Sequence, residues 1–312
     1  MAGAESPRAA NATLLRAWQR QWRAHRPAAL GLVAALIAVV WLLLASGLEA
    51  FTGASRASLR LALWGGLAGF GATALGALLA LAVRTIDTRM RDGMLGFAAG
   101  MMLAASSFSL ILPALDAATA QLGSGVAGAL VVTLGLGLGT LLMLGLDCFT
   151  PHAHESSGVH GPADARVGGV WLFVLAIVLH NLPEGMAIGV SFAQADLAVG
   201  LPLTAAIAIQ DIPEGLAVAL ALRAIGVALR PAILIAVASG LMEPLGAVVG
   251  LGLAGGLPIA YPIGLGLAAG AMIFVVSHEV IPETHRNGHE SAATLGLMAG
   301  FGVMMFLDTA LG

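Results

Sequence analysis

Long apolar runs, separated by short stretches that contain charges, glycine or proline, dominate the pattern of this 312-residue chain. A helix needs about 20 apolar residues to cross a bilayer, and each run is close to that length. The predicted spans lie at residues 28–46, 62–83, 93–113, 126–146, 168–192, 200–222, 231–254, 262–281 and 291–310. The pattern therefore predicts an all-α polytopic membrane protein.

The composition agrees with a location in the lipid bilayer. Hydrophobic residues make up 59% of the chain and charged residues only 10%, with a mean hydropathy of +0.94. A soluble domain would carry about 25% charged residues. The net charge of −3 and the lack of a basic cluster give no support for nucleic-acid binding. Cys148 is the only cysteine, so the chain can form no intrachain disulfide.

The arginines predict how the spans are oriented. All 14 basic residues are arginines, and nine spans assign each connecting segment to one side of the membrane. With the N-terminus inside, only Arg56 and Arg60 lie outside and the other 12 arginines lie inside. Because positive residues concentrate on the cytoplasmic side, we expect a cytoplasmic N-terminus and a periplasmic C-terminus.

The first apolar segment has two interpretations. Its run Ala28–Ala45 is 18 residues long, whereas the core of a signal peptide has about 7–15. We therefore expect an uncleaved extra span, although a cleaved signal peptide is the alternative. Residues 1–60 would form a cytoplasmic arm with this span, and residues 61–312 would form the core.

Two related six-residue strings occur inside consecutive apolar runs. Residues 180–185 read HNLPEG and residues 210–215 read QDIPEG, so Pro-Glu-Gly occurs twice in register. A carboxylate in the middle of a membrane costs roughly 3 kcal/mol, which makes such residues rare and usually functional. The repetition predicts one site that is built from both helices.

Helical spacing brings the polar residues of each string together. Positions i, i+3 and i+4 share a helix face, so the first two residues of each string neighbour its glutamate. Pro183 cannot donate to the carbonyl of Leu179, and Pro213 cannot donate to that of Ile209. The two spans are consecutive and hence antiparallel, so they could face each other with approximate two-fold symmetry around a midplane site.

A third polar position lies in the run 231–254, where Glu243 precedes a proline. Four unpaired carboxylates would together cost on the order of 10 kcal/mol in the bilayer, and no arginine lies within these spans to offset this. Two divalent cations would neutralise them. The alternatives are protonated or hydrogen-bonded carboxylates, and transport of protons or of an organic solute. The proposed carboxylates are Glu184, Asp211, Glu214 and Glu243, with His180, Asn181 and Gln210 completing the ligand shells.

The ligand types indicate a transition metal. Carboxylates alone suit Mg²⁺ or Mn²⁺, but an imidazole shifts the preference toward Zn, Fe, Ni or Co. Met102 could add a thioether that Zn²⁺ or Cd²⁺ would tolerate, although a methionine in a span is commonly a packing residue.

These motifs resemble those of the ZIP (Zrt/Irt-like) family of metal transporters, in particular its bacterial GufA-like branch. The resemblance runs from about residue 62 to the C-terminus and includes HNLPEGMAIG, QDIPEGLAVAL, SGLMEPLGA and VVSHEVIPETHRNGHE. It implies eight core helices in a 3+2+3 inverted repeat, here with one extra N-terminal helix. It also implies a homodimer in the bacterial inner membrane that takes up Zn²⁺ or Cd²⁺ by an elevator-like movement.

The resemblance further implies a binuclear site with two ligand sets. One metal would be held by Met102, His180, Glu184 and Glu214, with Gln210 nearby. The other would be held by Asn181, Asp211 and Glu243, with Glu184 and Glu214 bridging the two ions.

Three further polar groups are candidates for metal entry, exit or sensing. Residues at the membrane entrance would be Ser109, Asp116 and Asp308, which could instead be ordinary solvated positions. Exit-side residues near the inner end of a span would be His278 and Glu279, followed by Glu283, His285, His289 and Glu290. A cytoplasmic loop, either a weak metal sensor or simply solvated, would contain Asp147, His152, His154, Glu155, His160 and Asp164.

The 42 glycines fit close helix packing, or alternatively surfaces that slide during transport.

An intramembrane metal-dependent hydrolase is the main alternative function. A zinc protease would need the string His-Glu-x-x-His, which this chain lacks, so we do not expect an enzyme. A metal-sensing signalling protein is also unsupported, because the sequence contains no output domain.

Overall fold

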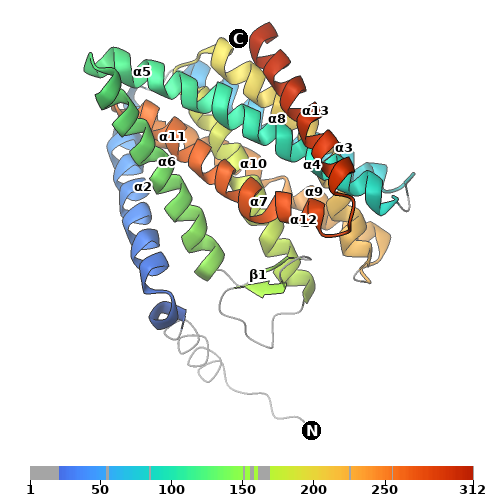
Figure 1. The fold of residues 1–312 in the computed structure, drawn as a ribbon. Coiled ribbons are helices and arrows are strands. Elements are labelled where there is room, and N and C mark those ends of the chain that lie inside the picture. The colour runs from blue at the N-terminus through green and yellow to red at the C-terminus, as the bar shows by residue number, and fades with distance from the viewer. Residues whose placement is uncertain are drawn as a thin grey trace.

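The computed structural model describes residues 21–53, 56–83, 86–149, 152–154, 158–160, 169–224, 226–254 and 256–311. These residues are almost entirely helical, and the helices form one tilted bundle (Figure 1). The first elements are α2 (Arg26–Gly53), α3 (Arg56–Leu79), α4 (Thr88–Ala105), the π-helical turn η1 (Ser106–Ile111), α5 (Leu112–Leu122) and α6 (Gly125–Phe149). A hairpin of β1 (His152–His154) and β2 (Gly158–His160) follows. The remaining elements are α7 (Gly169–Ser191), α8 (Leu197–Ala224), α9 (Leu229–Ser239), α10 (Met242–Ala254), α11 (Ala260–Val275), the π-helical turn η2 (Val276–Val280), α12 (Ile281–His285) and α13 (Glu290–Leu311).

The predicted polytopic helical fold is confirmed. Within the described part of the chain, eight helices or continuous helix chains are long and apolar enough to cross a membrane. They correspond to every predicted span except 168–192. That span coincides with α7, a 23-residue helix whose first half includes side chains outside the described set. At 1.5 Å per residue, α7 is about 34 Å long, which is enough to span the hydrocarbon core.

Two spans are longer than their apolar runs predict. The run 93–113 belongs to a helix chain from Thr88 to Leu122, and the run 262–281 belongs to one from Ala260 to His285. Each of these long helices contains a π-helical turn, and Pro113 or Pro282 is the second residue after it. A proline lacks the N–H of the helical ladder and crowds the carbonyl four residues earlier, and the wider π turn accommodates both effects. The helix therefore continues beyond the apolar run.

The predicted span 231–254 is interrupted near its middle. Helix α9 ends at Ser239 and α10 begins at Met242, so Gly240 and Leu241 form a turn inside the membrane segment. Pro244 explains part of this interruption, because it has no N–H to donate to the carbonyl of Gly240. The turn places Glu243 in the first turn of α10.

The β-hairpin lies in the segment between α6 and α7, where the sequence predicted a loop. Its antiparallel register pairs His152 with His160 and His154 with Gly158. It contacts the start of α7 and lies beside the lower end of that helix in Figure 1.

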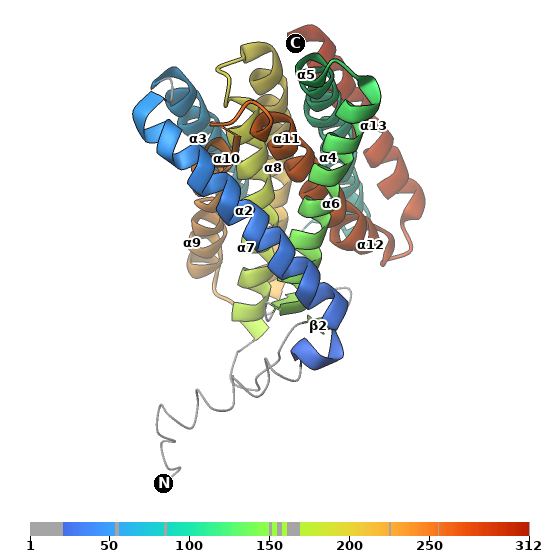
Figure 2. The same ribbon diagram turned by 90° about the vertical axis from the view of Figure 1, so that its left-hand side faces the viewer.

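The helices fall into two packed groups. In one group α3 packs against α8 and α10, and α7 packs against α10. In the other α4 packs against α13, and α6 packs against α11. Fewer contacts join the two groups than hold each one together, and they lie mainly between α4 and α8, between α11 and both α7 and α10, and between α8 and α13. Figure 2 shows α2 crossing the outside of the bundle, where it packs along α6 and contacts α10.

Glycines allow the closest helix contacts within each group. On α7, a Cβ added to Gly185 or Gly189 would collide with the backbone of Glu243 or Ala247. On the facing helix α10, Gly250 would likewise collide with the backbone of Met186. Small residues at four-residue spacing are the usual means by which transmembrane helices approach at backbone distance. This geometry favours the packing interpretation of these glycines.

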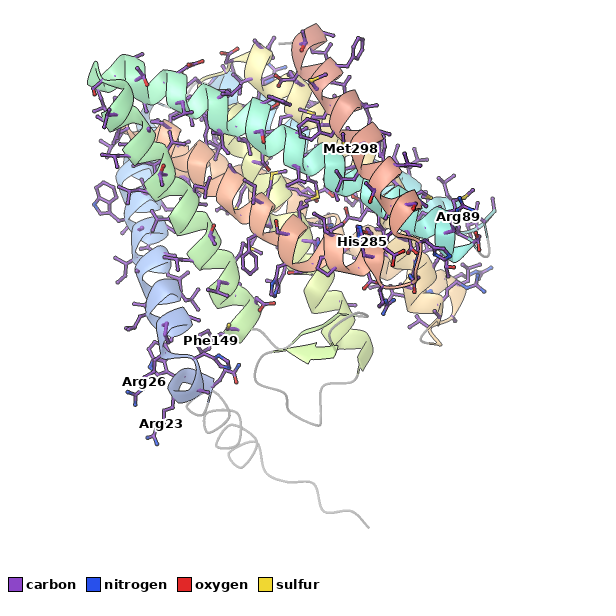
Figure 3. All side chains as sticks on the ribbon, in the orientation of Figure 1. Arg23, Arg26, Arg89, Phe149, His285 and Met298 are labelled. Atoms are coloured by element: carbon purple, nitrogen blue, oxygen red, sulfur yellow. The ribbon has the colours of Figure 1, made fainter. Side chains whose placement is uncertain are left out.

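The N-terminal helix is attached to the bundle at its lower end. The ring of Trp22 lies 5.9 Å from that of Phe149 at the end of α6. Figure 3 shows Arg23 and Arg26 near this end of α2 and Arg89 at the start of α4. These three arginines therefore lie near helix ends.

Candidate metal site

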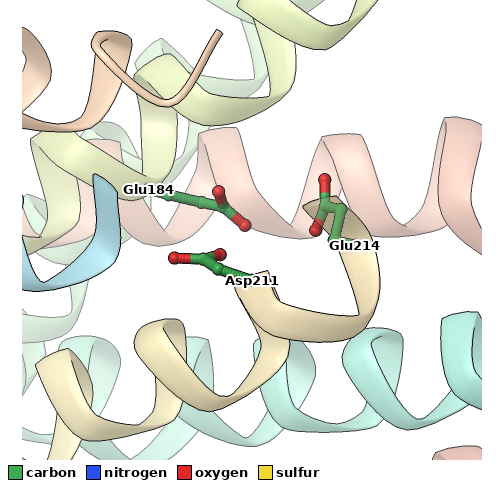
Figure 4. A group of neighbouring side chains, drawn as sticks. All are labelled: Glu184, Asp211 and Glu214. Atoms are coloured by element: carbon green, nitrogen blue, oxygen red, sulfur yellow. The ribbon is translucent and has the colours of Figure 1, made fainter. Parts of the chain in front are cut away.

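Three carboxylates converge in the middle of the bundle (Figure 4). Glu184 of α7 and Asp211 and Glu214 of α8 each offer a carboxylate oxygen, and these oxygens lie within 4.8 Å of one another. Glu184 and Asp211 are buried, and Glu214 is half-buried. At an effective dielectric constant of about 20, two unit charges 4.8 Å apart repel by about 3.5 kcal/mol. A multivalent cation between these groups would replace that repulsion with attraction.

The backbone brings these groups together without a helix break. Pro183 lies inside α7 and Pro213 lies inside α8, and both helices continue through them. Each glutamate follows its proline directly, so the two carboxylates project from equivalent positions on consecutive helices. The sequence prediction that the two strings face each other is confirmed by the approach of Glu184 to Asp211 and Glu214.

Gln210 joins the two helices across the site. Its Nε2 donates to Oε1 of Glu184 over 2.6 Å, and the side chain is fully buried. Asn181, one helical turn before Glu184, is also buried. The amide of Gln210 therefore contacts the carboxylate of the first string, while the place of Asn181 in the site stays a prediction.

Glu243 completes the polar cluster from α10. Its side chain is fully buried, and its Oε1 accepts a hydrogen bond of 2.6 Å from Oγ1 of Thr73 on α3. Gly69, one turn earlier on α3, leaves room for this carboxylate. A Cβ added to Gly69 would collide with Oε2 of Glu243 and lie 3.3 Å from Oδ2 of Asp211. The carboxylates of Glu243 and Asp211 therefore meet beside Gly69.

Several buried oxygens in this cluster lack a hydrogen-bond donor. Among the described residues, no donor reaches Oε1 of Gln210, Oδ2 of Asp211 or Oε2 of Glu243. A buried acceptor without a partner is costly, and acceptors gathered at one point are what a cation coordinates. The available metal ligands are carboxylate and amide oxygens with an imidazole nearby, and this combination suits a divalent metal ion.

His180 is held by a carboxylate that the sequence assigned elsewhere. Its Nδ1 lies 3.0 Å from Oε2 of Glu279 in η2, and both side chains are mostly buried. Histidines that bind metals commonly contact a carboxylate through their other ring nitrogen, which fixes the orientation of the ring. Glu279 was predicted as an exit-side ligand, but its contact with His180 gives it a position beside the central site.

Met102 lies in the interior of the bundle. It is on α4, only 1% exposed, and packs within the main apolar core. Helix α4 also contacts α8, which carries two of the central carboxylates. The packing interpretation and the ligand interpretation of Met102 both remain compatible with this position.

The exit-side residues form two separate groups. His278 lies 3.7 Å from Asp147 and stacks on Phe274 with ring centroids 4.9 Å apart. Asp147 was predicted in the loop, and this was wrong, because α6 continues to Phe149 and keeps Asp147 buried in its last turns. The sequence analysis predicted too short a helix here because the apolar run ends near residue 146, whereas α6 ends at Phe149.

His289 belongs to a different cluster from the one that we predicted. Its Nδ1 lies 2.8 Å from Oδ2 of Asp92, whose other oxygen, Oδ1, accepts a 2.9 Å hydrogen bond from Nδ2 of Asn287. Asp92, on α4, is completely buried, and sequence reasoning missed it. The only available signal was an acidic residue next to an arginine at the edge of an apolar run. His285 instead contacts Thr284 and the carbonyl of Ile281.

The loop histidines cannot be placed as ligands. The backbone of His152, His154 and His160 forms the hairpin, but their side chains lie outside the described residues. Glu155 and Asp164 lie outside the described residues altogether.

Two of the three entrance residues lie together. Oγ of Ser109 in η1 donates to Oδ1 of Asp308 on α13 over 2.6 Å. Asp116 is exposed on α5. A polar contact therefore joins η1 to the last turns of α13, and its role in metal entry remains a prediction.

Comparisons with known proteins identify the family. The family model described as ZIP Zinc transporter matches residues 148–308. The zinc transporter ZIPB of Bordetella bronchiseptica is 67% identical over 306 residues, which cover 98% of this chain and 99% of that protein. The zinc transporter GufA of Myxococcus xanthus is 43% identical, covering 77% and 95%, and human ZIP11 is 32% identical, covering 78% and 95%. The chain therefore belongs to the ZIP family of zinc transporters.

Proposed function

We propose that this chain imports Zn²⁺ into the cytoplasm through an intramembrane site that holds two divalent cations. The observation that carries the proposal is the convergence of Glu184, Asp211 and Glu214 within 4.8 Å, with Glu243 adjoining Asp211. Four carboxylates balance the charge of two divalent ions. Relatives that are named zinc transporters support zinc as the transported substrate. Cd²⁺, which has the same charge and softer character, is proposed as a second substrate.

We propose two ligand sets, which the contacts of His180, Asp211 and Glu243 support in part. One ion would bind near His180, whose ring is oriented by Glu279, and Met102 would be its soft ligand. The other ion would bind the oxygen ligands Asp211 and Glu243, with Asn181 nearby. Glu184 and Glu214 would bridge the two ions. Gln210, bonded to Glu184, supports this bridge by holding one oxygen in place.

An elevator-like movement is supported by the division of the helices into two groups. All four central carboxylates lie on α7, α8 and α10, which pack together with α3. The other group contains α4, α6, α11 and α13. The contacts between the two groups are fewer than those within the first group. We propose that the carboxylate-bearing group moves as a unit against the other and carries the metal between the two sides.

The chain is a multi-pass membrane protein, and we propose that it lies in the bacterial inner membrane as a homodimer. The excess of arginines in the segments assigned to the inside, 12 against 2, supports a cytoplasmic N-terminus and a periplasmic C-terminus. Residues 1–60 are proposed as an arm and extra span that precede the transporter core at 61–312. The packing of α2 along α6 supports a retained span, which favours it over a cleaved signal peptide.

Membership in a transporter family makes this chain a transporter rather than an enzyme, so the intramembrane hydrolase is not favoured. Purified protein in liposomes tests the proposal with a metal panel of Zn²⁺, Cd²⁺, Mn²⁺, Fe²⁺, Co²⁺ and Ni²⁺ at defined pH gradients. We expect saturable Zn²⁺ uptake that protein-free liposomes lack. Uptake that rises linearly with Zn²⁺ concentration and equals that of empty liposomes would contradict the proposal.

A further inference from the structure

A threonine on α3 makes an unusual contact with the candidate metal site. The usual partner of a helical threonine hydroxyl is the carbonyl four residues earlier. Ser106 and Ser107 on the neighbouring span follow that rule and bond the carbonyls of Met102 and Leu103. Thr73 does not, because its Oγ1 donates instead to Oε1 of Glu243, 170 residues away in the sequence.

The position of Thr73 is confined by two glycines, one in the turn between α9 and α10 and one on α8. A Cβ added to Gly240 would lie 3.1 Å from Cβ and 3.2 Å from Cγ2 of Thr73. A Cβ added to Gly215, the glycine of the second Pro-Glu-Gly, would collide with the carbonyl oxygen of Thr73. Both the backbone and the side chain of Thr73 are therefore confined. A β-branched side chain that is held in this way has little freedom to turn its hydroxyl elsewhere.

The contact divides the two oxygens of Glu243 between different tasks. At 2.6 Å, the bond to Oε1 has the length of a hydrogen bond from a hydroxyl to a carboxylate. Oε2 is buried with no donor among the described residues, and it lies beside Gly69 near Oδ2 of Asp211. The free oxygen therefore faces the site while the other is anchored to α3.

We propose that Thr73 is a positioning residue that fixes Glu243 as a single-oxygen ligand of the second metal ion. This inference rests on the proposed binuclear site and assigns α3 a role in it. Partners that orient metal ligands typically change metal affinity by about 10- to 100-fold when they are removed. Deleting the hydroxyl should therefore weaken the second ion and leave the first nearly unaffected.

Three variants separate the hydroxyl from the packing of the methyl group. Thr73→Val keeps the shape and removes the hydroxyl, and Thr73→Ala removes the hydroxyl without adding bulk. Thr73→Ser keeps the hydroxyl and removes the methyl group. Glu243→Ala serves as the reference for a lost second site. Equilibrium Zn²⁺ binding to purified, monodisperse protein gives the number of bound ions and the Kd of each.

The expected order identifies the role of Thr73. Wild type should bind two ions and Glu243→Ala one, and Thr73→Val and Thr73→Ala should bind the second ion about 10- to 100-fold more weakly. Thr73→Ser should stay within about threefold of wild type, because it retains the donor. The inference about Thr73 would be overturned if Thr73→Val and Thr73→Ala bound the second ion with wild-type affinity. It would also be overturned if Thr73→Ser lost as much affinity as those two variants. Neither result would bear on the proposed binuclear site. Two ions bound in Glu243→Ala would show that Glu243 is not needed for the second ion and would overturn the inference, whereas a single ion bound by wild type would overturn the proposed binuclear site.

Discussion

Gly69 offers a direct perturbation of the second metal position. It lies on α3, and a Cβ at this position would collide with Oε2 of Glu243. The colliding atom is the far end of a flexible side chain, so the fold can accommodate alanine by turning the carboxylate away. Gly69→Ala should therefore leave a folded protein with a displaced ligand.

The required displacement can be estimated from the structure. The added Cβ would lie 3.0 Å from Cδ of Glu243, whereas carbon atoms in contact are about 3.5–4.0 Å apart. The carboxylate must therefore move by at least about 0.5–1 Å, because its Oε2 lies closer still to the added Cβ than Cδ does. Metal–ligand distances tolerate only about 0.2 Å of deviation. We expect the second Zn²⁺ to bind at least about 10-fold more weakly, by analogy with the loss of an orienting partner.

A control two residues away on the same helix is available. An added Cβ on Gly71 meets no atom within 4 Å, so Gly71→Ala should bind and transport as the parent does. Zn²⁺ binding and Zn²⁺ uptake into liposomes would be measured for both variants at equal protein content. If Gly69→Ala matches Gly71→Ala in the affinity of the second ion, Glu243 is not a ligand in the way described here.

Further predictions concern selectivity, topology, the loop and pH. If Met102 is a soft ligand, Met102→Ala should reduce Cd²⁺ uptake more than Zn²⁺ uptake in competition assays, whereas Asp211→Ser should leave the ratio of Cd²⁺ to Zn²⁺ uptake nearly unchanged. Equal losses of Cd²⁺ and Zn²⁺ uptake in Met102→Ala would make the methionine a packing residue. A membrane-impermeant thiol reagent should label Cys148 only after spheroplasts are permeabilised, and labelling of intact spheroplasts would refute the topology. Replacing the three histidines at 152–160 by alanine should change the uptake rate only mildly, and complete loss in well-expressed protein would contradict this expectation. Zn²⁺ affinity should weaken as pH falls from 8 to 6, because protons compete for carboxylates and imidazole; titration calorimetry showing a constant affinity would argue against these ligands.

The centre of the site could be predicted from sequence because its information is local and repeated. Helical spacing places Glu184 and Glu214 beside the polar residues that precede them, and consecutive spans are antiparallel neighbours. The structure brings these glutamates and Asp211 together as that reasoning required. The alternation of apolar runs and arginines likewise predicted the helical, membrane-spanning fold.

The remaining features depend on contacts between distant segments. No periodicity links Thr73 to Glu243, or Asp92 to His289 across almost 200 positions. An isolated threonine in an apolar run has no distinguishing pattern, since its hydroxyl can bond its own helix. The π turns and the break before Met242 depend on how neighbouring helices accommodate prolines. The role of Met102 also remains a prediction, because burial of a methionine is common to packing residues and ligands.

The most direct test of the account is Zn²⁺ uptake by liposomes that contain Glu184→Ala or Glu214→Ala, compared with wild type at equal, folded protein content. Both glutamates are proposed to bridge two ions, so each variant should lose both metal positions together. We predict that neither variant exceeds the uptake of protein-free liposomes. Uptake at the wild-type rate by either variant would contradict the claim that zinc crosses the membrane through this site.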